Sequence, residues 1–358
     1  MRIGIDTQST FGFKTGIGYY VSNLIAQYKD KTEGLDLIKY NNGSAEDLST
    51  LKRFFWENIK LPGLVNKSDI DLLHIPGFAG PLSCGKIKKV TTIHDLIGVI
   101  YPENLGALSR LYWQKWLPAC VSNSDLIIAD SENTKHDIEL LLKIPSEKIK
   151  VIYIAVDKIF KPVDKQKSRN LLKKDYNITK PFILNVGTIE PRKNIPLLIK
   201  AFSEYKRLSN DELILVIVGK KAWDYKRCCD IINRLKISEY VIFCDYVKEK
   251  DLPIFYNSAE LFIYPSIYEG FGLPVLEAMA CGAGVICSNT SSLPEVAGEA
   301  GYYINPNSAD DIKQALLDVM KSKDLRGELR RKSVIQAAKF SWDNTARATL
   351  NVYKEVLN

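Results

Sequence analysis

The sequence predicts an α/β protein made of two doubly wound domains in series, with a cleft between them. Short apolar runs alternate with amphipathic segments along the 358 residues, which is the pattern of a parallel sheet covered by helices on both faces. The alternation pauses at residues 157–175, a Lys-rich stretch that contains Pro162, and then starts again. The chain length also fits about two domains of roughly 150 residues each.

The first half begins with an expected strand at residues 2–6, then a loop containing Gly16 and Gly18. Because they are short and rich in apolar or β-branched residues, further runs are expected to form buried strands at 72–75, 90–93, 126–129 and 150–154. Helices are expected at 19–28, 109–122 and 133–142.

In the second half, residues 157–175 are interpreted as a linker that leads into a short helix. Strands are expected at 182–186, 213–218, 241–244, 261–264 and 284–287. Helices are expected at 196–208, 227–235, 274–281, 310–321 and 325–338. Sheets of this kind bind ligands beyond the carboxyl ends of their strands, so the loops that follow the strands are the first places to look for a site.

The composition is that of an ordinary soluble globular protein, with 46% hydrophobic and 25% charged residues. A formal net charge of +7 permits anionic substrates or an anionic membrane surface without requiring either. No run of about 18 apolar residues predicts a membrane span, and the N-terminus lacks a signal-peptide pattern. The 7 scattered cysteines and 3 histidines fit reduced thiols in a cytoplasmic protein and argue against a zinc site.

The first candidate site is a glycine-rich turn, YEGFGLPVLE at residues 268–277, directly after an expected strand. Gly270 and Gly272 free the backbone just before a helix. Backbone N–H groups at such a helix start bind a phosphate or sugar oxygen. Glu269 and Glu277 suit the hydroxyls of a sugar or a ribose, which donate to carboxylates. A capped turn with surface glutamates is the alternative.

The second candidate site is NVGTIEPRKN at residues 185–194, after the first strand of the second half. Gly187 permits a tight turn there. Arg192 and Lys193 precede the next helix, and a guanidinium fork together with an ammonium matches a diphosphate. Cations at a helix N-terminus oppose the helix dipole, which favours an anionic ligand. A basic loop with no ligand is the alternative.

Two features of the first half complete the set. TGIG at residues 15–18 is an incomplete dinucleotide fingerprint, so we expect no nicotinamide cofactor and interpret it as a loop whose backbone approaches a ligand. His94 lies in TIHDL at residues 92–96, at the carboxyl end of an expected strand. A single histidine is more often structural, but this position favours a role in a site.

Together these motifs resemble the retaining glycosyltransferases of group 1 with the GT-B fold, which include bacterial mannosyl-, glucosyl- and rhamnosyltransferases. The E-x7-E motif of Glu269 and Glu277 is the strongest marker. VGTIEPRKN at 186–194 resembles the phosphate loop of the family, and SSLPEVAG at 291–298 and TIHDL at 92–96 also fit. The resemblance covers essentially the whole chain.

The resemblance implies the GT-B arrangement of two Rossmann-like domains. Residues 1–160 would form the acceptor-side domain, 161–340 the nucleotide-sugar-binding domain, and 341–358 a helix that crosses back to the first domain. The implied substrates are a nucleotide-diphosphate sugar and an acceptor that is lipid-linked or an oligosaccharide, in polysaccharide, glycolipid or lipopolysaccharide synthesis. Nucleic acid is not an expected partner.

Individual residues also take implied roles. Arg192 and Lys193 would hold the diphosphate, Glu277 the ribose, Glu269 the donor sugar and phosphate, and His94 would contact the donor sugar. Glu269, His94, Arg192 and Lys193 would stand closest to the chemistry. The full set implied for the donor is Gly16, Gly187, Arg192, Lys193, Val247, Glu269, Gly270, Phe271, Gly272, Leu273 and Glu277. In this set Gly16 allows close backbone approach to the phosphate, and the backbone around Val247 meets the nucleobase.

The implied reaction retains the anomeric configuration and needs neither a metal ion nor a cofactor, because Arg192 and Lys193 neutralise the leaving diphosphate. An acceptor hydroxyl attacks on the face that the diphosphate leaves, and the leaving phosphate oxygen takes its proton. One departure is Thr188, where some members of the family carry Arg. The phosphate-loop text most resembles members that use GDP-mannose.

Other functions stay open from the sequence. The same fold uses UDP- or TDP-sugars, and some members are glucan synthases. A nucleotide-sugar epimerase shares the two-domain architecture, although no acid/base motif for epimerisation is evident. A non-catalytic nucleotide-sugar-binding subunit would retain binding without turnover.

Contact with an anionic membrane is a further hypothesis. LKRFFWE at residues 51–57 mixes aromatic and basic side chains as interfacial helices do, and Lys86, Lys88 and Lys89 would add attraction to anionic lipids. The alternative is a helix packed on the domain core. The expected location is therefore the cytoplasm, at the inner face of the membrane.

Overall fold

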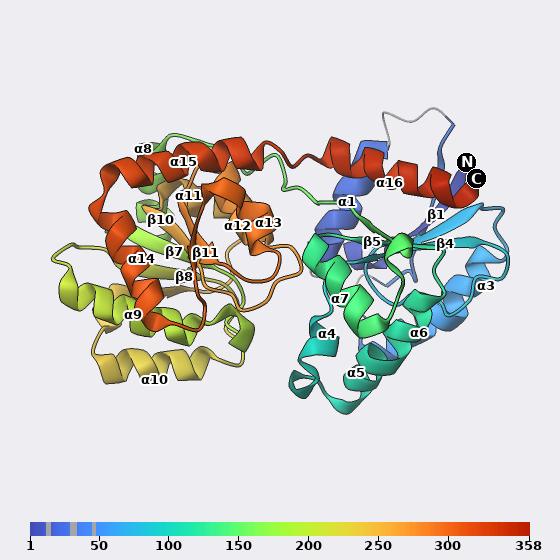
Figure 1. Ribbon diagram of the computed structural model, residues 1–358, viewed down its shortest axis with the longest axis horizontal. Coiled ribbons are helices and arrows are strands. Elements are labelled where there is room, and N and C mark those ends of the chain that lie inside the picture. Colours follow the sequence, from blue (N-terminus) through green and yellow to red (C-terminus); the bar gives the residue numbers. More distant parts are fainter. Residues whose placement is uncertain (12–15, 29–33, 45–47) are drawn as a thin grey trace. The chain divides into compact units, whose positions relative to one another are not determined.

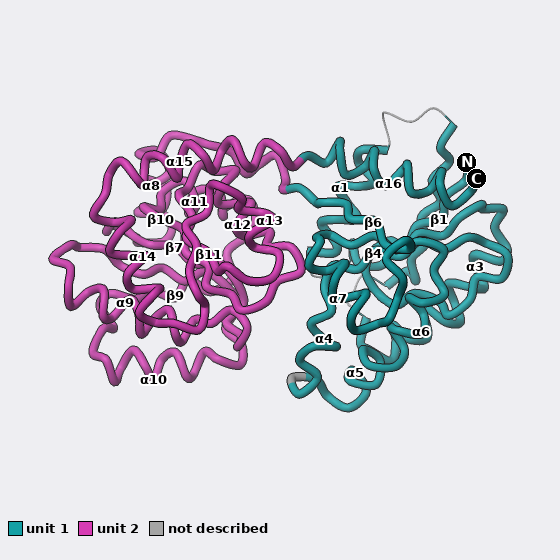
Figure 2. Tube along the Cα trace, in the orientation of Figure 1, with its two compact units in different colours: residues 1–155, 341–358 teal, residues 156–340 magenta. Residues whose placement is uncertain are grey.

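The computed structural model describes residues 1–11, 16–28, 34–44 and 48–358. Its contacts divide the chain into two units, which Figures 1 and 2 show. Unit 1 comprises Met1–Ala155 together with Ser341–Asn358, and unit 2 comprises Val156–Phe340. The sequence had placed its divisions after residues 160 and 340.

Unit 1 contains a six-stranded parallel sheet in the order β2-β1-β3-β4-β5-β6. Its strands are β1 (Arg2–Asp6), β2 (Asp36–Tyr40), β3 (Leu72–Ile75), β4 (Lys88–Ile93), β5 (Leu126–Ala129) and β6 (Ile149–Val151). Its helices are α1 (Gly16–Tyr28), α2 (Thr50–Phe55), α3 (Leu61–Val65), α4 (Ile97–Ile100), α5 (Ala107–Leu111), α6 (Leu117–Ser122), α7 (Glu132–Leu142) and α16 (Trp342–Leu357). Apolar side chains on both faces of the sheet are buried by these helices.

Unit 2 contains a second six-stranded parallel sheet in the order β12-β11-β10-β7-β8-β9. Its strands are β7 (Phe182–Val186), β8 (Ile214–Val218), β9 (Val241–Cys244), β10 (Leu261–Tyr264), β11 (Val285–Ser288) and β12 (Gly301–Ile304). Its helices are α8 (Lys165–Tyr176), α9 (Ile195–Leu208), α10 (Tyr225–Leu235), α11 (Leu252–Ser258), α12 (Leu273–Ala280), α13 (Leu293–Ala297), α14 (Ala309–Lys321) and α15 (Lys323–Ala337). The expected α/β class with two parallel sheets is confirmed.

The two strands that the sequence analysis missed, β2 and β12, each lie at one end of a sheet. Most residues of both strands are only half-buried or exposed. The apolar-run signal depends on burial of both strand faces, which an edge strand lacks. The missed strands therefore mark the limit of that signal.

Three other expected elements need correction. Residues 157–175 were expected to be a linker that leads into a short helix, and the helix is α8, which runs from Lys165 to Tyr176 and is capped by the Asp164 side chain, so the linker part is shorter than expected. The expected strand at 150–154 is the shorter β6. The expected helix at 109–122 is α5 and α6 joined through a π-helical turn, Tyr112–Trp116.

Helix α16 anchors the chain terminus in unit 1. The Tyr353 hydroxyl lies 2.7 Å from Nδ1 of the buried His74, and the Thr345 hydroxyl donates to the Tyr153 carbonyl at 2.7 Å. Figure 1 shows this helix next to α1, and the Tyr28 hydroxyl of α1 donates to the Ala346 carbonyl at 3.3 Å. Throughout the described ranges, every helix is too short or too polar to cross a membrane.

Candidate functional site

The candidate site of unit 2 lies where β7 and β10 end. These strands are neighbours in a parallel sheet, so the loops that follow them meet at one edge. The loop after β7 carries Arg192 and Lys193 on a short 3-10 turn, and the loop after β10 carries Glu269. The N–H of Ile267 donates to the Arg192 carbonyl at 2.8 Å, which ties the two loops together.

The Glu269 carboxylate is the centre of this site. One oxygen, Oε1, accepts hydrogen bonds from Lys193 Nζ at 2.6 Å, Ser266 Oγ at 2.6 Å and the Tyr264 hydroxyl at 2.9 Å. The other oxygen, Oε2, lies 2.7 Å from Arg192 Nη1. The structure therefore brings together three of the four residues that the sequence placed closest to the chemistry. We call Arg192, Lys193, Tyr264, Ser266 and Glu269 the Glu269 cluster.

Opposite charges keep the Glu269 carboxylate ionised although only 7% of the residue is exposed. Burial by itself would raise the pKa of Glu269, but Lys193 and Arg192 outweigh it and lower the pKa to about 2. Burial lowers the pKa of Lys193, and contact with Glu269 offsets part of that effect. The two cations are thus members of a buried ion-pair network and not unpaired side chains of a basic loop, which was the alternative left open by the sequence.

A second carboxylate completes this network. Arg192 Nε lies 2.7 Å from Glu190 Oε1, so the guanidinium is held between Glu190 and Glu269. Two cations and two carboxylates sum to no formal charge. An anionic ligand would therefore bind here by taking over hydrogen bonds that the carboxylates now accept.

The glycine-rich turn leads directly into α12. Gly272 has a φ of +102°, and a Cβ at this position would lie 2.6 Å from a Leu293 methyl carbon, so the turn requires glycine. Pro274 has no N–H, and the N–H groups of Val275 and Leu276 donate to the Gly272 carbonyl at 2.9 and 3.3 Å. Within the described residues, the N–H of Leu273 is therefore the donor that the start of α12 can offer to a ligand. Phe271 is buried and its ring packs 5.8 Å from the Phe340 ring. In this turn, the structure favours ligand contact with backbone groups over contact with the Phe271 side chain.

Glu277 does not join the Glu269 cluster. It lies on α12, where the Tyr256 hydroxyl donates to its Oε2 at 2.7 Å. Burial raises the pKa of Glu277 to about 7, and the hydrogen bond from Tyr256 offsets part of the rise. Within the described chain Oε1 has no such partner, so this carboxylate is able to accept from a hydroxyl.

The remaining candidates of unit 2 are backbone positions. Gly187 follows β7 and donates its N–H to the Val218 carbonyl at 2.8 Å. A Cβ on Gly187 would meet the aliphatic chain of Lys193 at 3.5 Å, so this residue lies beside the cluster. Val247 is buried in the loop after β9.

His94 lies in unit 1, in the loop directly after β4. Its Nδ1 is 2.5 Å from Asp130 Oδ2, and its Nε2 is 3.2 Å from the Pro76 carbonyl oxygen. Burial would lower the pKa of His94, but Asp130 and the Pro76 carbonyl raise it above the ordinary 6.5. With an acceptor at each nitrogen, His94 is best satisfied as the imidazolium.

Gly77 allows the His94 ring to pack close to Ile17 of α1, because it has no side chain. Gly77 has a φ of +133°, and a Cβ there would lie 2.9 Å from His94 and 2.8 Å from Ile17. Gly16, the exposed first residue of α1, is the neighbour of Ile17. The structure therefore places the start of α1 beside the loop that carries His94, through the side chain of Ile17, while Thr15 of the same motif lies outside the described residues.

The hypothesis that residues 51–57 and three nearby lysines contact a membrane is wrong for some of these residues. Trp56 and Glu57 are buried in a π-helical turn, Trp56–Lys60, that follows α2. Lys89 is also buried and donates to the carbonyls of Pro81 at 2.9 Å and Cys120 at 2.6 Å. Lys89 is therefore a structural residue that adds nothing to attraction for lipids.

The sequence analysis missed Asp130, Tyr256, Tyr264 and Ser266. Asp130 and Tyr264 stand at the carboxyl ends of expected strands, so the rule that singled out His94 would also have found them. Ser266 and Tyr256 gave no such signal, because their roles depend on the carboxylates that fold against them.

Comparisons with known proteins show the family and the fold of the chain. The family model described as "Glycosyl transferases group 1" matches residues 167–339, and "Glycosyltransferase Family 4" matches residues 32–158. O-antigen chain mannosyltransferase B of Escherichia coli is 33% identical over 267 residues, which are 75% of this chain and 70% of that protein. Serotype-specific mannosyltransferase WbdA of Escherichia coli is 34% identical over 275 residues, but the chain spans only 34% of its length.

Solved structures share the fold over nearly the whole chain. Sucrose-phosphate synthase from Thermosynechococcus elongatus aligns with a TM-score of 0.75 at 20% identity, covering 99% of this chain and 98% of that one. Anabaena HepE in complex with UDP and glucose gives 0.78 at 17% identity, covering 99% and 100%. WaaG, a glycosyltransferase of lipopolysaccharide biosynthesis, gives 0.70 at 15% identity, covering 98% and 99%.

Proposed function

Since the chain belongs to the glycosyl transferases group 1 family and is a glycosyltransferase, we propose that it transfers mannose from GDP-mannose. The acceptor is a hydroxyl of a lipid-linked glycan or an oligosaccharide, in the synthesis of a polysaccharide or lipopolysaccharide. The proposed reaction retains the anomeric configuration and uses no metal ion.

The Glu269 cluster is the observation that carries this proposal. A leaving nucleoside diphosphate is stabilised by cations that the fold already holds close to one another. Glu269 holds Arg192 and Lys193 in this way, at 2.7 and 2.6 Å. The α12 N-terminus follows the same loop, and the Leu273 N–H is the backbone donor proposed there. The diphosphate binds to these groups, and the Glu277 carboxylate accepts from a ribose hydroxyl.

The chemistry follows from this arrangement. The bond between the anomeric carbon and the diphosphate oxygen breaks, and a bond from the acceptor oxygen forms on the same face. The proton of the acceptor hydroxyl passes to the leaving diphosphate oxygen, so the step balances without a separate base. In unit 1, His94 and the backbone at Gly16 are the groups proposed to contact the donor.

The choice of mannose rests on the relatives, and the choice of GDP rests on the resemblance of residues 186–194 to members of the family that use GDP-mannose. O-antigen chain mannosyltransferases from Escherichia coli and Salmonella typhimurium are 33% and 29% identical to this chain over the aligned residues. HepE, which shares the fold at 17% identity, was solved with UDP and glucose. A UDP- or TDP-sugar is therefore the alternative donor, and a non-catalytic binding subunit is the alternative of another class.

Thermal unfolding with GDP, UDP, ADP or TDP, each in EDTA, tests the donor. A nucleotide at 100 times its dissociation constant stabilises the native state by about 2.7 kcal/mol. We expect this shift with GDP and not with the other three. A shift with UDP or TDP alone would contradict GDP-mannose. Turnover of GDP-mannose followed by NMR of the first-formed anomer then tests retention.

We also propose that unit 1 binds an anionic membrane surface through α2 and α5. Thr50 and Ser109 join these helices by a 2.9 Å hydrogen bond between their hydroxyls. Large apolar side chains that are more than half exposed lie on both helices and the π-helical turn between α2 and α3: Leu51, Phe55, Ile59, Leu108 and Leu111. Lys52 and Arg110 lie on the same helices and supply attraction to anionic lipids. Sedimentation with anionic liposomes at low salt tests this, and absence of binding would contradict it.

A further inference from the structure

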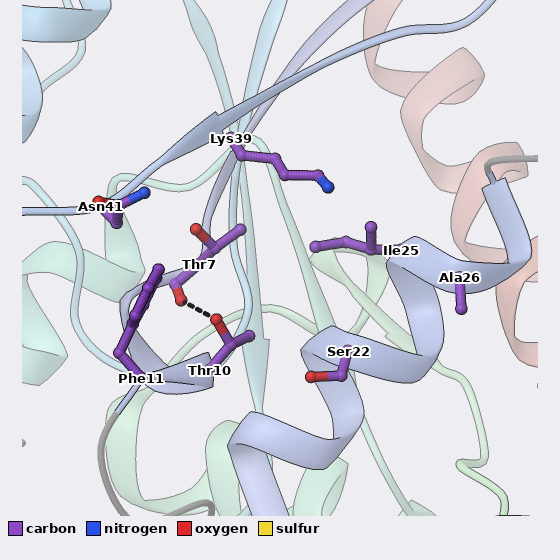
Figure 3. Close-up of a pocket in the computed structure, with 8 residues that line it drawn as sticks. All are labelled: Thr7, Thr10, Phe11, Ser22, Ile25, Ala26, Lys39 and Asn41. Carbon is purple, nitrogen blue, oxygen red and sulfur yellow. Dashed lines mark hydrogen bonds between the residues drawn. The ribbon is translucent and has the colours of Figure 1, made fainter. Parts of the chain in front are cut away.

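A pocket of about 400 Å³ lies in unit 1 between α1 and the edge strand β2. Its volume is in the range of small-molecule sites. Figure 3 shows its lining, with Ser22, Ile25 and Ala26 on α1, Lys39 and Asn41 at the end of β2, and Phe11 after β1. Because β1 and β2 are parallel and both end here, the pocket is at the edge of the sheet where doubly wound folds bind ligands.

The polar groups that face this pocket and have no partner are donors. Within the described chain, nothing hydrogen-bonds or pairs with the Lys39 ammonium or the Ser22 hydroxyl. Asn41 uses its side-chain oxygen to accept from the Gly43 N–H at 3.0 Å, which leaves its amide nitrogen as a donor. An ammonium, a hydroxyl and an amide nitrogen in one pocket suit a ligand rich in acceptor oxygens and negative in charge.

The other hydroxyls of the pocket are already used by the fold. Thr7 Oγ1 donates to the Tyr40 carbonyl at 2.9 Å, and Thr10 Oγ1 donates to the Thr7 carbonyl at 2.8 Å. Figure 3 shows the second of these bonds at the wall of the pocket. These bonds fix the loop after β1 and so hold Phe11 at the rim.

Apolar surface covers the rest of the lining. The Phe11 ring is 37% exposed, and Ile25 and Ala26 present aliphatic carbons from α1. A pyranose ring has a face of C–H groups that packs on such surface while its hydroxyls stay at the polar side. A bare phosphate ion would leave this apolar half without contacts.

We propose that this pocket binds a hexose that carries a phosphoryl group, with the phosphoryl oxygens on Lys39 and Asn41 and the sugar ring against Phe11. The proposal rests on the proposed function, because it takes the ligand to be a phosphorylated sugar of the glycan acceptor. The pocket would then supply the acceptor subsite that the donor residues do not provide.

Calorimetric titration of the full chain with mannose 6-phosphate, methyl α-mannoside and inorganic phosphate tests the proposal. We expect mannose 6-phosphate to bind at least about tenfold more tightly than either fragment, and Lys39→Gln to remove about tenfold of that affinity. Ser22→Ala should weaken binding less. Lys67→Gln is the matched control, since Lys67 is an exposed lysine of the same unit outside the pocket.

Three results would overturn the proposal: no binding of mannose 6-phosphate by the native protein, equal affinity for it in the native protein and Lys39→Gln, or phosphate alone binding as tightly. Nucleotide-induced thermal shifts separate this test from the donor test. Lys39→Gln should keep the full shift with GDP. If no nucleotide raises the melting temperature but mannose 6-phosphate still binds in a manner that depends on Lys39, the proposed donor is wrong. The proposal for the pocket is then unaffected.

Discussion

Each unit buries a glutamate near the carboxyl edge of its sheet, and the two have opposite charge states. Glu269 of unit 2 is 7% exposed and has a pKa lowered to about 2. Glu57 of unit 1 is 1% exposed and has a pKa raised to about 8. Equal burial therefore does not decide whether a buried carboxyl group carries a charge.

The neighbours of each glutamate account for the difference. Lys193 and Arg192 both contact Glu269, and their charges outweigh its desolvation. At Glu57 the effect of burial exceeds the lowering effect of the Arg53 charge on the pKa. The Tyr112 hydroxyl lies 3.1 and 3.0 Å from its two carboxyl oxygens. A charged buried cluster is suited to exchange partners with an anionic ligand. A neutral pair serves to join two π-helical turns, one holding Glu57 and the other Tyr112.

The largest effect is expected from removing a cation of the Glu269 cluster. Lys193→Ala deletes a charge-assisted donor to the diphosphate and leaves Glu269 partly unpaired. Transfer activity should fall by about 10²- to 10⁴-fold, the equivalent of roughly 3–6 kcal/mol. Steady-state kinetics with circular dichroism as the folding check measures this. Glu269→Ala should lose most of its activity in the same way.

A lysine outside the cluster supplies the control for this measurement. Lys206→Ala removes an ammonium that lies 2.9 Å from Asp211, in the same unit but away from the loops of the site. It should retain turnover. Native-like activity in Lys193→Ala would show that the cluster is structural in unit 2 as well, and the contrast with Glu57 would lose its functional meaning.

A smaller effect is expected from Asp130, which we treat as a positioning residue for His94. Asp130→Asn keeps the shape of the side chain but removes the charge that favours the imidazolium. The pKa of His94 should fall, so activity should decline at a lower pH than in the native protein. The loss near neutral pH should be about 10- to 100-fold, from one charge-assisted hydrogen bond.

The pH–rate profile distinguishes this role from a merely structural one. Asp125→Asn is the control, because Asp125 pairs with Lys88 at 2.9 Å outside the His94 site. A uniform loss of rate with an unchanged profile in Asp130→Asn would mean that Asp130 supports the fold and not the charge of His94.

The sequence was informative where a single chain segment carries the signal. Strands buried on both faces and the loops after them were predicted, so Arg192, Lys193, Glu269 and His94 were all found. Edge strands β2 and β12 were missed because half-exposed strands lack a continuous apolar run. The partners of a side chain could not be predicted either, because those of Glu269 and Glu57 include residues from distant segments of the chain. The same residue type, glutamate, is therefore ionised within a charged cluster in unit 2 and neutral in a pair with tyrosine in unit 1.

A pH dependence of stability, measured without any turnover, tests the contrast directly at Glu57. The native state holds a proton on Glu57 up to pH of about 8, while an unfolded glutamate releases it near the ordinary pKa of 4.5. Between these values the native state binds more protons, so this group makes stability fall as pH rises. Glu269 acts in the opposite direction, because its stabilisation is present above pH 4.5 and is lost as pH falls toward 2.

Glu57→Gln mimics the protonated side chain and should remove the Glu57 contribution. We expect the variant to match the native protein near pH 5 and to exceed it in melting temperature near pH 8, since each unit of pKa difference is worth about 1.4 kcal/mol. Glu147→Gln, at an exposed glutamate of the same unit, should leave the profile unchanged. Parallel profiles for Glu57→Gln and the native protein would mean that Glu57 is ionised in the fold. The two buried glutamates would then differ only in their partners, and the charge state would no longer separate the site of unit 2 from the core of unit 1.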